Sequence, residues 1–215
     1  MLAIAGGKGG CGKTTTALGL ARALAERGDR PVVADADCDM PNLHTVAETD
    51  RGPGLDVLAG DSRVERCIHR SGAVRGVDIV PAGTAARSVD SAALDRLERL
   101  PETVLLDCPA GATDAVGVAL RAATGVLLVS TAQRQSLTDA AKTARMADAV
   151  GTDVVGAVVT RVDDDSPPAA TAGGPLAEEC RVLATVPEIP GEPLHSRVGR
   201  ASYDRLARTL ERRNI

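Results

Sequence analysis

Glycines and two lysines near the beginning of the chain are spaced to hold a phosphate group. Residues 6–16 read Gly-Gly-Lys-Gly-Gly-Cys-Gly-Lys-Thr-Thr-Thr, which contains G-x-x-x-x-G-K-[ST]. In such a loop the glycines let backbone N–H groups close around phosphate oxygens, the lysine reaches the β- and γ-phosphates, and the threonine hydroxyl ligates Mg²⁺. The pattern therefore predicts a nucleotide-binding loop formed by Gly7, Lys8, Gly9, Gly10, Cys11, Gly12, Lys13, Thr14 and Thr15.

Acidic residues follow two apolar stretches farther along the chain. Arg30–Asp35 is typical of a buried strand, and its last residue is followed closely by Asp37 and Asp39. Thr103–Leu106 is a second apolar strand, which ends at Asp107. Ligands of open α/β sheets bind at the carboxyl ends of strands, and an acidic residue there can bind Mg²⁺ through water. We therefore expect Asp107 at a metal, and the earlier acidic cluster to hold metal-bound water or to orient an attacking water.

Strands and helices that would position these residues alternate along the chain. Leu2–Ala5 is a short apolar run before the glycine loop, and Lys13–Arg27 has apolar residues at helical spacing and ends at Gly28. Further strands are expected at 77–80, 125–130, 154–160 and 183–186, further helices at 55–58, 64–69, 88–100, 136–150 and 201–213, and a loop at 163–174. The alternation predicts an α/β fold with a doubly wound, mostly parallel sheet and helices on both faces.

The composition fits one such domain and sets limits on the partners. The chain has 215 residues, of which 44% are hydrophobic, so we expect a single domain over 1–215. Tyr203 is its one aromatic residue, so the chain lacks the several aromatic side chains on which the bases of a single-stranded nucleic acid stack. The net charge of −4 argues weakly against a protein that binds nucleic acid over much of its surface. Five isolated cysteines are typical of a reduced, cytoplasmic protein. We expect neither a signal peptide nor an apolar run of about 18 residues, the length needed to span a bilayer.

Several motifs together resemble the MinD/ParA family of deviant-Walker ATPases over essentially the whole chain. Residues 8–14 match the family's K-G-G-x-G-K-[ST], in which the first lysine, Lys8, distinguishes the family from ordinary phosphate-binding loops. Asp35 and Asp37 match D-x-D, residues 42–43 match an asparagine-leucine pair, and residues 107–111 match D-x-P-x-G. The pairs at positions where the family contacts adenine are Thr160-Arg161 and Pro187-Glu188.

The resemblance implies a switch that uses ATP and Mg²⁺ and works as an ATP-dependent homodimer. It places Lys13 on the β- and γ-phosphates. The metal would be bound by the Thr14 hydroxyl and, through water, by Asp107. Asp37 would orient the attacking water, with Asp35 as the second choice, and Lys8 would reach the phosphates of the other protomer. The switch loops it implies contain Asp35, Asp37, Asn42, Pro109 and Gly111. Hydrolysis is expected to be slow and stimulated by a partner.

In cells, the family implies a protein that positions division, chromosome, plasmid or motility machinery. It would be cytoplasmic and recruited to poles, nucleoid or membrane by an unidentified activating or cargo protein. Well-known MinD proteins carry a further amphipathic segment after the last helix, whereas this sequence stops at Ile215. Stable membrane binding without a partner is therefore not expected. The apolar stripe of the last helix is expected to pack on the sheet; it consists of Tyr203, Leu206, Ala207 and Leu210.

A module that binds ATP without hydrolysing it remains open from the sequence, and ATP turnover with and without a partner would distinguish it. Two further alternatives concern other ligands. A basic surface with Arg197, Arg200 and Arg213 would fit a ParA-like partition ATPase that binds DNA without sequence preference. A metal-cluster carrier of the same superfamily would need paired cysteines, whereas Cys108 and Cys180 stand singly. ATP-dependent DNA binding and bound iron, respectively, distinguish these alternatives from a MinD-like switch.

Overall fold

The computed structural model describes residues 1–60, 63–162 and 174–213. The strands are β1 (Leu2–Gly6), β2 (Val32–Asp35), β3 (His69–Arg70), β4 (Asp78–Val80), β5 (Val104–Ala110), β6 (Gly125–Thr131), β7 (Asp153–Val162) and β8 (Val182–Pro187). The helices are α1 (Lys13–Ala25), α2 (Leu43–Val46), α3 (Leu55–Leu58), α4 (Ser91–Glu98), α5 (Asp114–Ala122), α6 (Arg134–Ala149), α8 (Pro175–Glu179) and α9 (Arg197–Glu211), with a 3-10 turn at Val64–Arg66. The loop predicted at 163–174 lies, except for its last residue, outside the described residues.

Within the described residues, eight strands form one sheet in the order β3-β4-β2-β5-β1-β6-β7-β8. All neighbouring strands run parallel except β3 and β4, which pair antiparallel. The central strand β1 lies between β5 and β6, so the glycine loop that follows it starts in the middle of the sheet. The α/β class and the mostly parallel, doubly wound sheet predicted from the sequence are confirmed.

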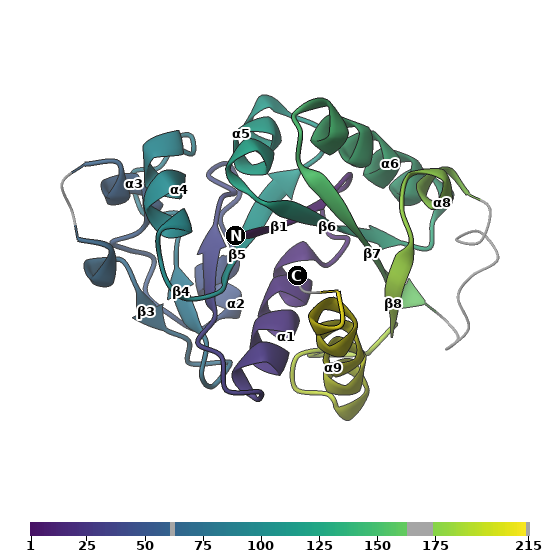
Figure 1. The fold of residues 1–215 in the computed structure, drawn as a ribbon. Coiled ribbons are helices and arrows are strands. Elements are labelled where there is room, and N and C mark those ends of the chain that lie inside the picture. Colours follow the sequence, from purple (N-terminus) through teal and green to yellow (C-terminus); the bar gives the residue numbers. More distant parts are fainter. Residues whose placement is uncertain (61–62, 163–173, 214–215) are drawn as a thin grey trace.

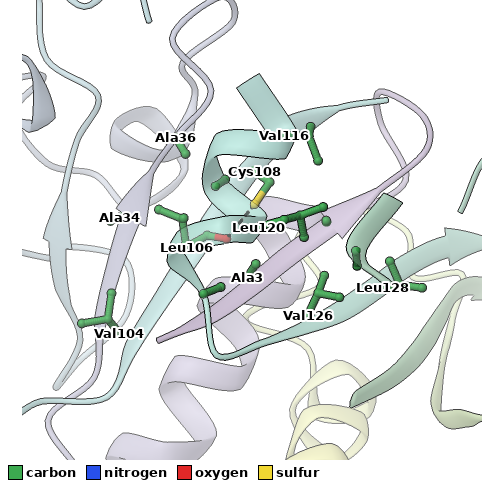
Figure 2. Packing of buried hydrophobic residues seen from close by; sticks show 14 of the residues in the cluster. Ala3, Ala34, Ala36, Val104, Leu106, Cys108, Val116, Leu120, Val126 and Leu128 are labelled. Carbon is green, nitrogen blue, oxygen red and sulfur yellow. Dashed lines mark hydrogen bonds between the residues drawn. The ribbon is translucent and has the colours of Figure 1, made fainter. Parts of the chain in front are cut away.

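Side chains that alternate along each strand supply two separate cores. Ala3 and Ala5 face a core covered by α4, α5 and α6, whereas Ile4 faces the opposite core, which is covered by α1 and α9. The other central strands alternate in the same way, because successive strand residues point to opposite faces. Figure 2 shows the first core, in which strand residues such as Ala3 and Cys108 lie with Val116 and Leu120 of α5. A sheet buried on both faces explains the nearly uninterrupted apolar strands of the sequence.

Some elements differ from those predicted. The strand expected at 103–106 continues as β5 through Pro109 to Ala110, so Asp107 lies within the strand and the expected switch loop is shorter. The helix expected at 64–69 is only a 3-10 turn, after which His69 enters β3. Helix α5 was not predicted. The last helix begins earlier than expected, at Arg197, because the Ser196 hydroxyl accepts a hydrogen bond from the Gly199 N–H and caps it.

The stripe predicted on α9 packs against the rest of the protein as expected. Tyr203, Leu206, Ala207 and Leu210 are all buried in the core shared with α1. None of the helices in the described ranges is long and apolar enough to cross a membrane.

Candidate functional site

The glycine loop joins the end of β1 to the beginning of α1. Gly12 has φ of 95°, a left-handed conformation that glycine adopts without steric cost, and it precedes the first helical residue, Lys13. The loop is held from below by Thr160 on β7, whose hydroxyl donates a 2.7 Å hydrogen bond to the Cys11 carbonyl. The Gly111 N–H donates to the Gly6 carbonyl at 3.1 Å. The loop and the end of β1 are therefore held by β7 and by the residue after β5, while the N–H groups of the loop stay at the positive end of α1.

A cavity of about 640 Å³, called here the phosphate cavity, opens over this loop. The predicted residues that line it come from four segments, and they are Gly9, Gly10, Gly12, Lys13, Thr14, Thr15, Asp37, Asn42, Asp107 and Arg161. They meet because the carboxyl ends of β1, β2, β5 and β7 lie at one edge of a parallel sheet. The phosphate-binding glycines, the lysine and two acids predicted from separate motifs thus share one cavity.

The two acids at and just after the end of β2 have different surroundings. Asp35 is fully buried and both its carboxylate oxygens accept backbone hydrogen bonds, from the Asp37 N–H at 3.0 Å and the Leu43 N–H at 3.2 Å. Asp37 is less buried, lines the phosphate cavity and accepts a 3.0 Å hydrogen bond from the Met40 N–H. Asp35 therefore shapes the loop to α2, and Asp37 is the acid in a position to meet a ligand.

Two buried acids lie close together at this edge of the sheet. Asp35 and Asp107 lie opposite each other on β2 and β5. Burial raises the pKa of the Asp107 carboxyl to about 7, and the charge of Asp35 adds to this, against the lowering effects of the Thr14 hydroxyl and the Lys13 ammonium. Burial likewise raises the pKa of Asp35 to about 6, although its backbone hydrogen bonds oppose the shift. A cation at this place would be strongly stabilised.

The oxygen atoms around Asp107 fit a magnesium ion that is bound together with a nucleotide. The Oδ1 atom of Asp107 is buried and has no hydrogen-bond partner in the part of the chain that the structure describes. Thr14 lies beside it, and its hydroxyl donates to Oδ1 of Asn42 at 3.0 Å, which leaves a lone pair for a metal. No group of three or more His, Cys, Asp or Glu side chains in the described ranges forms a metal site on its own. Such a sparse set suits Mg²⁺, which takes its other ligands from phosphate and water.

A second cavity, of about 430 Å³, adjoins the phosphate cavity on the side of β6 and is called here the side cavity. Six predicted residues line it, and they are Lys8, Gly9, Gly10, Cys11, Arg161 and Glu188. Arg161 borders both cavities and has φ of 53°, a left-handed conformation rarely adopted by residues other than glycine. Such strained positions often belong to ligand sites.

Residues that the sequence reasoning missed also line these cavities. Thr131, Ala132, Gln133 and Ser136 line the side cavity, whereas Met40, His44, Thr45 and Arg51 line the phosphate cavity. The sequence contains an indication of the first group, because these residues lie at and just after the carboxyl end of β6. Ligands of open α/β sheets bind at that end of the strands.

Besides the buried Asp35, five predicted site residues line neither cavity. Gly7 packs against the backbone of Asp139 in α6, and the Thr160 hydroxyl faces the Cys11 carbonyl. Pro187 ends β8, where it pairs with Val162 of β7. Pro109 lies within β5, and Gly111 is bonded to the beginning of the glycine loop. These residues support the site from behind.

Comparisons with known proteins agree with this geometry. Residues 2–189 match the family described as the CobQ/CobB/MinD/ParA nucleotide binding domain. An uncharacterized ATP-binding protein of Methanocaldococcus jannaschii is 35% identical over 198 residues, which make up 88% of this chain and 74% of that protein. The crystal structure of the cell division ATPase MinD of Pyrococcus furiosus is 31% identical, with a TM-score of 0.82 over 98% of both chains. The septum site-determining protein MinD of Pyrococcus horikoshii, complexed with Mg-ADP, is 27% identical, with a TM-score of 0.83 over 99% of this chain and 96% of that chain.

Proposed function

Because the chain belongs to the CobQ/CobB/MinD/ParA nucleotide-binding family, we propose that it is an ATP-hydrolysing switch whose two protomers close face to face over two nucleotides. The single observation that carries this proposal is the convergence of Lys13, Thr14, Asp37 and Asp107 on one cavity, with Lys8 exposed beside it. ATP and Mg²⁺ are the cofactors that suit this set, and the similar MinD of Pyrococcus horikoshii was solved with Mg-ADP.

Each residue then has a role that follows from its position. Lys13 is nearly buried and lies over the loop, with its Nζ 3.5 Å from the Lys8 carbonyl, so it would turn its charge toward the β- and γ-phosphates. Thr14 and Asp107 would hold Mg²⁺, which neutralises phosphate charge when bound. Asp37 would orient the attacking water, because it is the acid of the β2 loop that faces the cavity.

Lys8 is proposed to act on the nucleotide of the second protomer. Its side chain is exposed and borders the side cavity, whereas Lys13 is close to the phosphate loop of its own chain. Positive charge supplied only on dimerisation would make hydrolysis depend on assembly. The product of the reaction would then be a change in dimer state and partner choice, with which the protein positions a cellular structure.

ATP turnover and sedimentation of purified protein with ATP or ADP test this function. Lys13→Ala should lose nucleotide binding, and Lys8→Ala should bind ATP but stay monomeric and inactive. Lys142→Ala is the matched control, since Lys142 is the third lysine of the chain and pairs with Asp139 on the surface of α6. A Lys8→Ala protein that dimerises and hydrolyses ATP like the unchanged protein would overturn the trans role of Lys8.

A partition ATPase that binds DNA remains the second candidate. The three arginines proposed for it lie on or beside α9, but Arg200 Nε donates to the Leu194 carbonyl at 3.4 Å and Arg213 Nη1 to the Val155 carbonyl at 3.1 Å. DNA binding measured with ATP across a salt series decides this candidate, because phosphate contacts weaken as salt rises. The cluster-carrier alternative would use Cys108, but this residue is buried and burial raises the pKa of its thiol, which disfavours the thiolate that iron requires.

A further inference from the structure

A groove at the far edge of the sheet is separate from both cavities of the nucleotide site. It has a volume of about 400 Å³ and lies between β8 and α9, which pack together at this end of the molecule (Figure 1). Val182–Thr185 of β8 form one side, and Arg205, Arg208, Thr209 and Arg212 of α9 form the other. We call this the edge groove; it shares no residue with the phosphate cavity or the side cavity.

The strand side of the edge groove exposes the edge of the sheet. β8 is the last strand in the sheet order and pairs only with β7 among the described strands. Val182–Thr185 line the groove consecutively, whereas side chains on a single face of a strand would contribute only every second residue. The groove therefore runs along the backbone of β8, where N–H and C=O groups on the outer side are available to another strand.

The helix side of the edge groove is positively charged. Arg205, Arg208 and Arg212 follow one another at helical spacing, and Arg205 Nη2 donates to the Ser202 hydroxyl at 3.0 Å. No acidic residue in the described ranges lines this groove. The acids of α9 are engaged elsewhere: Asp204 pairs with Arg22 of α1, and Glu211 pairs with Arg27 just after α1.

We propose that the edge groove binds an extended acidic segment of a partner protein, which adds to the sheet as a strand beside β8. Backbone hydrogen bonds to β8 would hold the segment, and its carboxylates on the α9 side would meet the arginines, which form two parallel bonds with a carboxylate. A peptide fits better than nucleic acid because half of the groove is the edge of β8. This edge can form backbone hydrogen bonds with a peptide, but it carries no positive charge that would attract phosphates. The net charge of −4 also opposes a general nucleic-acid surface.

Binding of a synthetic peptide tests the proposal without knowledge of the natural partner. The probe is a fluorescently labelled, capped ten-residue peptide in which Glu and Val alternate, and its binding is followed by anisotropy. A second peptide of the same sequence, N-methylated at every residue, cannot donate a backbone hydrogen bond to β8 from either edge but has the same charge. A DNA duplex of similar length is the third probe, and amide hydrogen exchange reports whether 182–185 becomes protected.

We expect the alternating peptide to bind, and Arg208→Glu/Arg212→Glu to weaken it about tenfold or more, since each exposed ion pair contributes modestly. Arg208→Gln/Arg212→Gln removes the charge without reversing it, and thermal unfolding of both variants checks that α9 is intact. Arg99→Glu, an exposed arginine at the end of α4, is the matched control and should leave binding unchanged. ATP turnover should stay the same in all these variants, which separates this proposal from the proposed function.

Equal binding of the N-methylated peptide, or no slowing of exchange at 182–185, would overturn strand addition. Binding of the DNA duplex that depends on Arg208 and Arg212, with no binding of the acidic peptide, would replace the peptide with nucleic acid and overturn the proposal.

Discussion

Thr14 and Asn42 are joined by a hydrogen bond of 3.0 Å, in which the threonine hydroxyl donates to Oδ1 of the asparagine. The first residue lies in the first turn of α1, after the glycine loop, and the second precedes α2. The bond therefore links the phosphate loop to the segment that carries Asp37. Because the Thr14 proton is directed at Asn42, a lone pair of the hydroxyl is left for a metal, and Asn42 would orient this proposed ligand.

Asn42→Ala is expected to weaken Mg²⁺ binding about tenfold, because groups that orient a metal ligand typically contribute that much. Binding of ATP without magnesium should change little, since the glycine loop is untouched. Titration of Mg²⁺ into the protein with bound nucleotide measures both. Thr45→Ala is the matched control: Thr45 lines the same cavity, but its hydroxyl pairs with His44. Equal magnesium affinity in the Asn42 and Thr45 variants would contradict the orienting role.

Asp35 and Asp37 should respond differently to replacement by alanine. Asp37→Ala is expected to bind ATP, to lose about 100-fold or more in turnover because the attacking water is no longer oriented, and to accumulate as the ATP-bound dimer. Asp35→Ala leaves two backbone N–H groups without acceptors and should lower the free energy of unfolding by about 1 kcal/mol or more. Turnover and thermal unfolding of both variants check the assignment, which normal hydrolysis by Asp37→Ala would refute.

The fold could be predicted largely because the strands are short, apolar and separated by clear helices. The strand before the glycine loop and the helix after it were found from the motif and from the apolar spacing of 13–27. Helix α5 was missed because Asp114–Ala122 mixes Val, Gly and Ala over only 9 residues, which gives a weak helical signal. β5 was cut short at Asp107 because Pro109 is unfavourable in a central strand; it is accommodated where the register with β1 shifts.

For the site, the sequence identified the residues that bear charge and missed some of those that shape the cavities. Motif spacing brought Lys13, Thr14 and Asp107 together in one cavity, because the loop after β1 and the carboxyl half of β5 lie at the same edge of the parallel sheet. It could not show that Thr160 faces the loop from behind, since that depends on the register of β6 and β7. The difference in burial between Asp35 and Asp37 likewise depends on how the folded chain packs.

Asp107→Asn is expected to stabilise the nucleotide-free protein. Burial raises the pKa of this carboxyl to about 7 from its ordinary value of 3.8, so ionised Asp107 costs the folded state free energy that grows as pH rises from about 4 to about 7. A neutral amide avoids that cost, and we expect the free energy of unfolding at pH 8 to rise by roughly 2 kcal/mol. The gain should shrink at pH 5, where the carboxyl in the folded unchanged protein is already protonated.

Thermal unfolding at both pH values, with and without Mg-ATP, measures these effects for Asp107→Asn. The unchanged protein should gain stability from Mg-ATP, and the variant should gain much less because the metal loses a ligand. Glu98→Gln, which removes an exposed carboxylate from α4, is the control for the loss of one negative charge. An unfolding temperature of Asp107→Asn at pH 8 that is no higher than that of the unchanged protein would show that burial of this charge costs little.

Gly19→Ala tests the contact between the phosphate-loop helix and the last helix. Gly19 of α1 lies directly against the ring of Tyr203 of α9, so a methyl group there would overlap the ring. Tyr203 is only 2% exposed, so its ring is enclosed by protein on almost every side. Alanine favours a helix by about 1 kcal/mol over glycine, but overpacking costs about 1–3 kcal/mol, so we expect a net decrease in the free energy of unfolding by denaturant. Gly60→Ala, whose methyl would meet only ordinary contacts, should cause no such loss.

Tyr203→Leu should restore part of the stability in the Gly19→Ala background, because the smaller side chain makes room for the methyl group. Additive losses in the double variant would instead show that the two residues do not interact.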